Sequence, residues 1–217
     1  MASRYYVYIS DAKVDMLLSQ VDPGFGRRII TEAGAGLRLF SAKRTVQAPE
    51  PDHIARLERV LRHLEEEGRV GDVDEPAPYF RGRLPMRWGP LPGGGASTVY
   101  FAGRTARTIL GLGGSGGHVL GPAAPPPAQF APSSLPALLA GLGAALAGEA
   151  GEAGELPADD EHLGWVHTAG LLLRGPLQEV EFLARRLLTG PSPYPEIDGR
   201  PDLRVLLGSP LYVALAD

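Results

Sequence analysis

A series of glycines at residues 111–121 constrains the fold of this 217-residue chain more than any other feature. It holds six glycines, one serine and one histidine, and follows a segment from Val99 that is typical of a strand. Glycine weakens regular secondary structure, and a segment with this many glycines therefore needs a local explanation. Either the backbone turns sharply, or another group approaches it closely. We interpret the segment as a glycine-rich loop, and both explanations stay open.

Hydrophobic periodicity predicts strands and helices in an irregular order along the chain. Pro85, within one of the strands, indicates an edge position because proline cannot complete a ladder. Without regular strand–helix alternation, we predict an α+β fold with a mixed or largely antiparallel sheet packed with about four helices. The expected strands are residues 4–9, 28–31, 37–41, 80–88, 97–101, 163–173, 203–207 and 211–215, and the expected helices 10–21, 52–67, 135–146 and 176–189.

The chain is predicted to form a single domain over residues 1–217, since its length allows a sizeable core. Residues 148–161 are acidic and rich in small residues, and we expect a flexible loop there. The part that follows this loop is about 60 residues long, which is marginal for independent stability.

Composition excludes several classes of function. The formal net charge of -4 argues against a nucleic-acid partner. Cysteine is absent, which removes disulfides and thiolate chemistry, and the five histidines show no metal-ligand spacing, so we predict neither a metal site nor a cofactor. The N-terminal residues lack the apolar core of a signal peptide, and no apolar run is long enough to cross a bilayer. We expect a cytoplasmic protein without a membrane partner; the oligomeric state stays open.

Residues 111–116 match the pattern G-x-G-x-x-G, but a dinucleotide site also needs a helix that begins inside the motif. The following residues are rich in glycine and proline and cannot supply one. A weaker hypothesis is that successive backbone N–H groups bind an anion. The candidate ligand-binding residues are Arg104, Thr105, Arg107, Thr108, Gly113, Gly114, Ser115 and His118, with Arg81 and Lys13 from elsewhere in the chain.

Three further patterns bear on these candidates. Arg81, Arg83 and Arg87 share one face of the strand at 80–88, which would give a positive patch. Lys13 belongs to a polar cluster at the first strand–helix junction, where helix capping is an equally good explanation. Ser115 and His118 could form a nucleophile and base, although the strand–Ser–helix context is missing.

Four segments together resemble an uncharacterised, mainly actinobacterial family of unknown function. They are YYVYISDAKVDM (residues 5–16), LPMRWG (84–89), LGLGGSGGHVLG (110–121) and LLGSPLYV (206–213). The resemblance spans nearly the whole chain, which implies a single domain, and it implies no activity.

Three functions remain open on the sequence. The first is a non-catalytic cytoplasmic module, with a possible regulatory role, that binds an anionic small molecule or a protein partner. The second is a small hydrolase or transferase acting on a phosphate- or carboxylate-bearing substrate at the glycine-rich segment. The third is a structural or assembly subunit. The sequence does not decide whether the protein is an enzyme.

Overall fold

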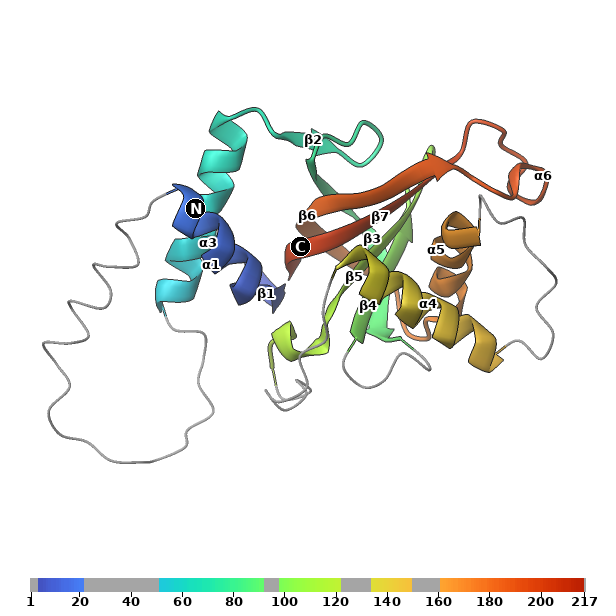
Figure 1. Ribbon diagram of the computed structural model, residues 1–217, viewed down its shortest axis with the longest axis horizontal. Coiled ribbons are helices and arrows are strands. Elements are labelled where there is room, and N and C mark those ends of the chain that lie inside the picture. Colours follow the sequence, from blue (N-terminus) through green and yellow to red (C-terminus); the bar gives the residue numbers. More distant parts are fainter. Residues whose placement is uncertain (1–3, 22–50, 92–97, 122–133, 150–160, 217) are drawn as a thin grey trace, which may run out of the picture. The chain divides into compact units, whose positions relative to one another are not determined.

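The computed structural model describes residues 4–21, 51–91, 98–121, 134–149 and 161–216 (Figure 1). Its contacts divide the chain into two compact units, one of residues 1–10 and 69–217 and the other of residues 11–68. The strands predicted at 28–31 and 37–41 lie outside the described residues, as does most of the acidic loop predicted at 148–161. The single domain stays a prediction.

Five strands of the larger unit form a closed barrel. β3 pairs with β4, β4 with β5, and β7 with β6, all antiparallel, whereas β5 pairs with β7 in parallel. The barrel closes because β6 also pairs with β3. The barrel strands are β3 (Tyr79–Pro90), β4 (Thr98–Arg104), β5 (Thr108–Ser115), β6 (Gln178–Pro191) and β7 (Arg204–Leu215), and the shorter β1 (Tyr5–Ile9) and β2 (Val70–Asp72) extend it by pairing with β7 and β3.

The fold class predicted from the sequence is therefore wrong. We expected a mixed or largely antiparallel sheet covered by helices, and the observed fold is a barrel-like α+β fold in which the sheet closes on itself. The reason is the β3–β6 ladder, which runs from Tyr79↔Arg185 to Met86↔Gln178 and joins segments about a hundred residues apart. No local pattern reports such a pairing.

The barrel interior is one hydrophobic core. Successive side chains of a strand point to opposite faces, so alternate residues enter it, as in β3 with Phe80, Leu84 and Met86. Phe80 packs edge-on against Phe182 of β6, with ring centroids 5.9 Å apart. The predicted alternation of β3 is thus confirmed on its apolar side.

Two helices cover part of the outer surface of the barrel (Figure 1). They are α4 (Leu135–Glu149) and α5 (Glu161–Leu172), and they form a second apolar cluster with outward-facing side chains of β4, β5 and β7. Tyr100 and Leu207 are buried in this cluster beside Val166 of α5. A one-turn 3₁₀ helix, η1 (Gly116–His118), follows β5, and the four-residue α6 (Pro195–Asp198) precedes β7.

The smaller unit holds two helices that contact each other, α1 (Asp11–Val21) and α3 (Pro51–Glu66). Both agree with the helices expected at 10–21 and 52–67. Two polar contacts link them: His53 Nδ1 lies 3.0 Å from Asp11 Oδ1, and Arg56 Nη1 forms an ion pair at 2.7 Å with Asp15 Oδ1. The buried residues of the pair are Val14, Leu17 and Leu18 of α1 and Leu57, Val60 and Leu64 of α3.

Two consecutive elements have the opposite type of secondary structure from the one predicted from the sequence. Of residues 163–173, expected to be a strand, all but the last belong to the helix α5, and of residues 176–189, expected to be a helix, residues 178–189 form most of β6. In α5 the buried residues Leu163, Val166 and Ala169 recur every three positions. In β6, Val180 and Phe182 recur every two, and register shifts beyond Leu183 interrupt that alternation and leave apparent helical spacing.

Pro85 is also not on an edge strand. β3 pairs with β6 along residues 79–86 and with β4 along residues 86–90, so both of its edges are used, but by different strands. Pro85 lies where the β4 pairing ends, which is why the missing N–H group is tolerated inside a closed barrel.

Candidate functional site

The glycine-rich segment is not a loop. Residues 108–115 form β5, which pairs with β4 as far as Ser115 and with β7 as far as Leu112. The backbone N–H groups of this strand therefore belong to ladders, and they do not form the anion-binding concavity that the sequence suggested. Only Gly116–His118 turn, as η1.

The glycines of β5 give room to large neighbouring side chains. A Cβ atom on Gly111 would lie 2.6 Å from Tyr100 Cζ, and one on Gly113 would lie 2.7 Å from Leu138 Cδ2. On the barrel interior, a Cβ atom on Gly114 would lie 2.8 Å from Tyr8 Cζ. The close approach left open by the sequence is thus an approach of the protein's own side chains.

Three of the predicted anion ligands bind a carboxylate of the protein itself. Asp74 Oδ1 accepts hydrogen bonds from Thr105 Oγ1 (2.5 Å) and Thr108 Oγ1 (2.8 Å), and Arg107 Nε lies 3.6 Å from Asp74 Oδ2. Burial raises the pKa of Asp74, but these hydrogen bonds and the charge of Arg107 outweigh it and leave the pKa below its usual value. The cluster attaches the segment after β2 to the β4–β5 turn.

Replacing Asp74 with alanine is expected to lower the free energy of unfolding at pH 7 by about 1–3 kcal/mol, the usual cost of leaving hydrogen-bonding groups without partners. A carboxyl whose pKa is lowered by folding stabilises the fold above its unfolded pKa of about 3.9, and this stabilisation is lost as the pH falls through the folded-state value. Urea unfolding at pH 7 and at pH 2 measures both effects. The difference from the unsubstituted protein should shrink at pH 2.

Asp72→Ala, which removes an exposed carboxylate of β2, is the matched control and should change stability little at either pH. An equal loss in both variants, or a loss from Asp74→Ala that persists unchanged at pH 2, would contradict the role given to this cluster.

Ser115 and His118 do not share a site with the arginines. Ser115 is buried, and its hydroxyl accepts a hydrogen bond from the N–H group of Gly117 at 3.3 Å. His118 packs edge-on against the ring of Tyr8, with centroids 5.9 Å apart. Arg104 pairs with Ile109 at the other end of the β4–β5 hairpin, six residues along β5 from Ser115, or about 20 Å at the rise of a strand.

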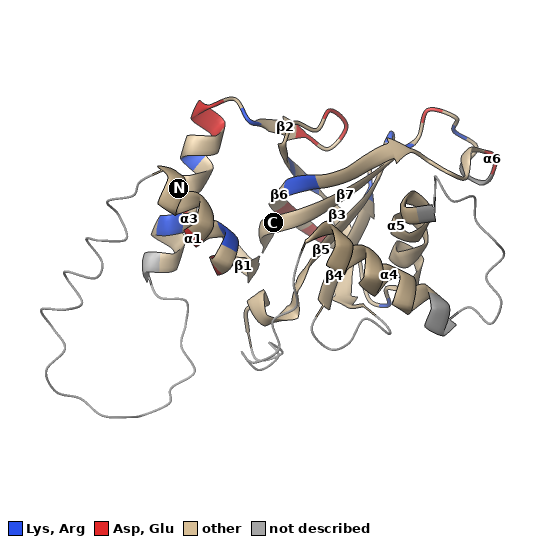
Figure 2. Cartoon of the chain, viewed as in Figure 1, with Lys and Arg blue, Asp and Glu red and all other residues tan. Residues whose placement is uncertain are grey.

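The predicted positive face of β3 is partly neutralised by β6. Arg83 Nε lies 3.7 Å from Glu179 Oε1, and Arg4 forms an ion pair with Glu181 of the same strand. Arg81 is exposed on β3 at the level of β2. Figure 2 shows both signs of charge on the strands of the barrel.

Lys13 lies in α1 of the smaller unit, and burial lowers its pKa to about 8. It is half-buried. The ten predicted site residues are therefore not brought together: they divide between the Asp74 cluster, the β5 strand and its turn, the exposed faces of β3 and β4, and α1.

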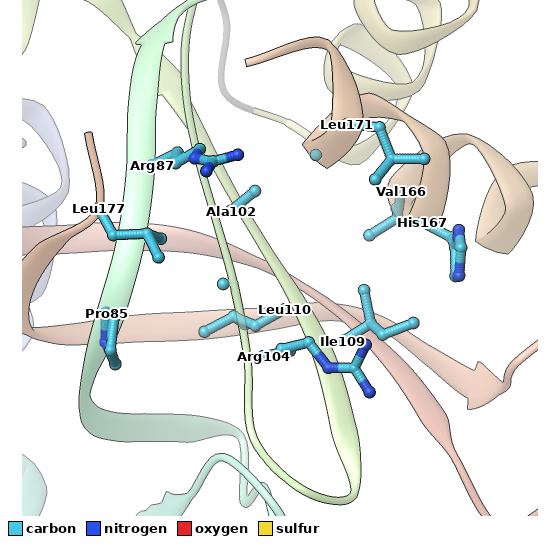
Figure 3. A pocket seen from close by; sticks show the side chains of 12 residues that line it. Pro85, Arg87, Ala102, Arg104, Ile109, Leu110, Val166, His167, Leu171 and Leu177 are labelled. Carbon is cyan, nitrogen blue, oxygen red and sulfur yellow. The ribbon is translucent and has the colours of Figure 1, made fainter. Parts of the chain in front are cut away.

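A cavity of about 580 Å³ lies on the outside of the barrel, between α5 and the strands β3, β4 and β5 (Figure 3). A volume of this order suits a small organic ligand. Helix α5 approaches β4 closely here, since a Cβ atom on Gly170 would lie 3.0 Å from the Cβ atom of Ala102. The lining residues are mostly apolar: Pro85, Arg87, Ala102, Gly103, Arg104, Ile109, Leu110, Val166, His167, Gly170, Leu171 and Leu177.

Two guanidinium groups belong to this lining. Arg87 pairs across the strands with Ala102, which is two residues from Arg104. The two arginines therefore occupy diagonal positions on one face of the sheet, where Cα atoms are about 7–8 Å apart. In Figure 3 the Arg87 side chain extends toward α5, whereas the Arg104 side chain lies further along the sheet, beyond Ile109. Among the described residues, neither arginine has a hydrogen-bonding or ion-pair partner for its side chain.

The remaining polar side chain of the lining is His167, whose ring lies edge-on to Tyr194 with centroids 5.1 Å apart. No carboxylate or hydroxyl side chain belongs to the described lining. A nucleophile with its base, or a set of metal ligands, would need such groups. Chemically, the arrangement suits recognition of negative charge beside an apolar surface.

Sequence reasoning identified Arg104 but missed most of this cavity. Arg87 was considered only as part of the β3 face and His167 only among the five histidines without metal-ligand spacing, and Leu171 and Leu177 were assigned to the strand expected at 163–173 and the helix expected at 176–189. The cause is the wrong secondary structure predicted for α5 and β6, because the cavity exists only if residues 161–172 form a helix. In the sequence, the available indication of this cavity was a pair of leucines, Leu171 and Leu177, on either side of Gly175–Pro176. In the structure Leu171 is 75% exposed and Leu177 is 58% exposed.

Neither a membrane-spanning helix nor a metal-binding cluster occurs among the described residues. No helix there has the length and apolar character needed to cross a membrane. No group of three or more histidine, aspartate or glutamate side chains in that part of the chain is placed to hold a metal ion.

The fold and cavity define a five-stranded barrel with an externally attached helical layer. The chain belongs to a family of unknown function, DUF7019, whose model matches residues 4–217. No curated protein and no solved structure matches it.

Proposed function

We propose that this protein is a non-catalytic binding module that takes up an anionic small molecule in the cavity between α5 and strands β3–β5. The observation that supports the proposal is the placement of Arg87 and Arg104, without side-chain partners among the described residues, on the wall of an otherwise apolar cavity. Guanidinium groups bind carboxylates and phosphates through paired, charge-assisted hydrogen bonds.

A hydrolase or transferase at Ser115 and His118 has less support. Ser115 is 2% exposed and holds the turn of η1, and it lies at the far end of β5 from Arg104. Within the described chain, the cavity lining also offers no hydroxyl, thiol or carboxylate side chain beside His167. Binding without chemistry is the function that this arrangement supports best.

The proposal predicts that carboxylates or phosphate monoesters stabilise the folded protein. At a concentration a hundred times its dissociation constant, a ligand adds about 2.7 kcal/mol, which raises the melting temperature of a chain of this size by about 5–10 °C. Arg104→Gln is expected to weaken binding of the same ligand about 10- to 100-fold, because a hydrogen bond to a charged group is lost. Thermal-shift screening followed by calorimetric titration measures both.

Arg185→Gln is the matched control. Arg185 is exposed on β6, outside the cavity, and this substitution removes the same charge from the same barrel. It should leave affinity unchanged. The proposal fails if no anion in the panel stabilises the protein, or if Arg104→Gln and Arg185→Gln behave alike.

A further inference from the structure

The cavity separates charge from apolar surface. Arg87 and Arg104 are exposed, whereas Val166 of the same lining is only 1% exposed. The charged groups thus lie toward solvent and the apolar groups lie deeper. A ligand that matched both parts would keep a charged end near water and place an uncharged end against the apolar wall.

The apolar surface also continues outward from the cavity. Leu171 at the end of α5 is 75% exposed, and Leu177 just before β6 is 58% exposed. Figure 3 shows them on opposite sides of the cavity. A chain-like ligand lying between the two leucines would cover both side chains and remove apolar surface from water.

A strongly polar anion fits this lining less well. Apart from the two guanidinium groups and His167, the described lining residues carry no hydrogen-bonding side chain. The hydroxyl groups of a sugar phosphate would therefore lose water without gaining side-chain partners, which disfavours binding. An aliphatic body has no such groups to satisfy.

Resting on the proposed function, we infer that the ligand is an amphipathic anion, a free carboxylate or phosphate monoester with an aliphatic chain. Its charged head binds Arg87 and Arg104, and its chain lies along Val166, Leu171 and Leu177. The ligand is thus recognised by charge complementarity at its head and by burial of apolar surface along its chain.

A chain-length series tests the inference. Isothermal titration with straight-chain carboxylates from butanoate to decanoate should show affinity rising about three- to fourfold per added methylene, until the cavity is filled. An alcohol of equal length should bind about 10- to 100-fold more weakly than the carboxylate. Acetate and inorganic phosphate should show no measurable binding.

Substitutions at two exposed positions test the contact with the aliphatic chain of the ligand. Leu171→Ser and Leu177→Ser should each weaken decanoate binding about three- to tenfold and change butanoate binding less, because less apolar area is covered. Met16→Ser is the matched control, since Met16 is also exposed (48%) but lies in α1, outside the lining. It should leave both affinities unchanged.

The possible failures are distinguishable. If phosphate or acetate binds as tightly as decanoate and needs Arg104, the anionic cavity stands and the aliphatic ligand is overturned. If no anion binds at all, the proposed function itself fails. If the protein sediments with phosphatidylglycerol vesicles, but not with phosphatidylcholine vesicles, and ignores free decanoate, a lipid surface rather than a free ligand is recognised, and the inference is overturned.

Discussion

Replacing Gly111 with alanine is expected to lower the free energy of unfolding by about 2 kcal/mol, within the range measured for overpacked cores. The added Cβ atom would lie 2.6 Å from Tyr100 Cζ and 3.1 Å from Val166 Cγ1. Tyr100 is 1% exposed, so its rigid ring has no free space to enter. For a chain of this size the loss corresponds to about 4–8 °C in melting temperature, which scanning calorimetry can measure.

Two companion variants make this result specific. Tyr100→Phe removes the hydroxyl group nearest to the new methyl group, so the double variant should recover a large part of the lost stability. The hydrogen bond sacrificed is long, 3.4 Å from Tyr100 Oη to the carbonyl oxygen of Val166. Gly89→Ala is the control, since a Cβ atom on Gly89 meets nothing within 4 Å.

A different set of stabilities and affinities would support a ligand-binding role for the glycines. If Gly111→Ala were as stable as Gly89→Ala but lost affinity for anions, the space at Gly111 would serve a ligand and not Tyr100. The packing explanation requires the opposite: lost stability, rescued by Tyr100→Phe.

Local patterns predicted the parts of the fold that depend on near neighbours. The alternation of Phe80, Leu84 and Met86 identified β3, and the stripe of α3 ended where Gly68 (φ 64°) allows a left-handed turn. The closed barrel was not predictable in this way, because it depends on the pairing of β3 with β6. Where β6 is irregular in register, its leucines imitate helical spacing, and the sequence prediction followed them.

The candidate site, like the fold, was predictable from the sequence only where it depends on neighbouring residues. The sequence assigned Thr105, Arg107 and Thr108 to an anionic ligand, and in the structure these residues contact Asp74 of the same chain. The glycines were interpreted as backbone exposed to a ligand, whereas they accommodate Tyr8, Tyr100 and Leu138. The cavity depends on α5 packing beside β4, a tertiary arrangement that no motif reports.

The second large effect concerns the two arginines together. Replacing both Arg87 and Arg104 with glutamine is expected to weaken binding of an aliphatic carboxylate about a hundredfold, to the affinity of the alcohol of equal length, since each substitution removes a charge-assisted contact. If both guanidinium groups bind one head group, as the inference requires, the two single losses should not add. The alcohol of the same chain length lacks the charge and should bind all variants equally.

Calorimetric titration of octanoate and octanol into the unsubstituted protein, the two single variants and the double variant is therefore the most direct test of the cavity as an anion-binding site. We predict that the preference for octanoate over octanol falls in each single variant and disappears in the double variant, while octanol affinity stays constant. An octanoate preference that survives the loss of both arginines would contradict this account.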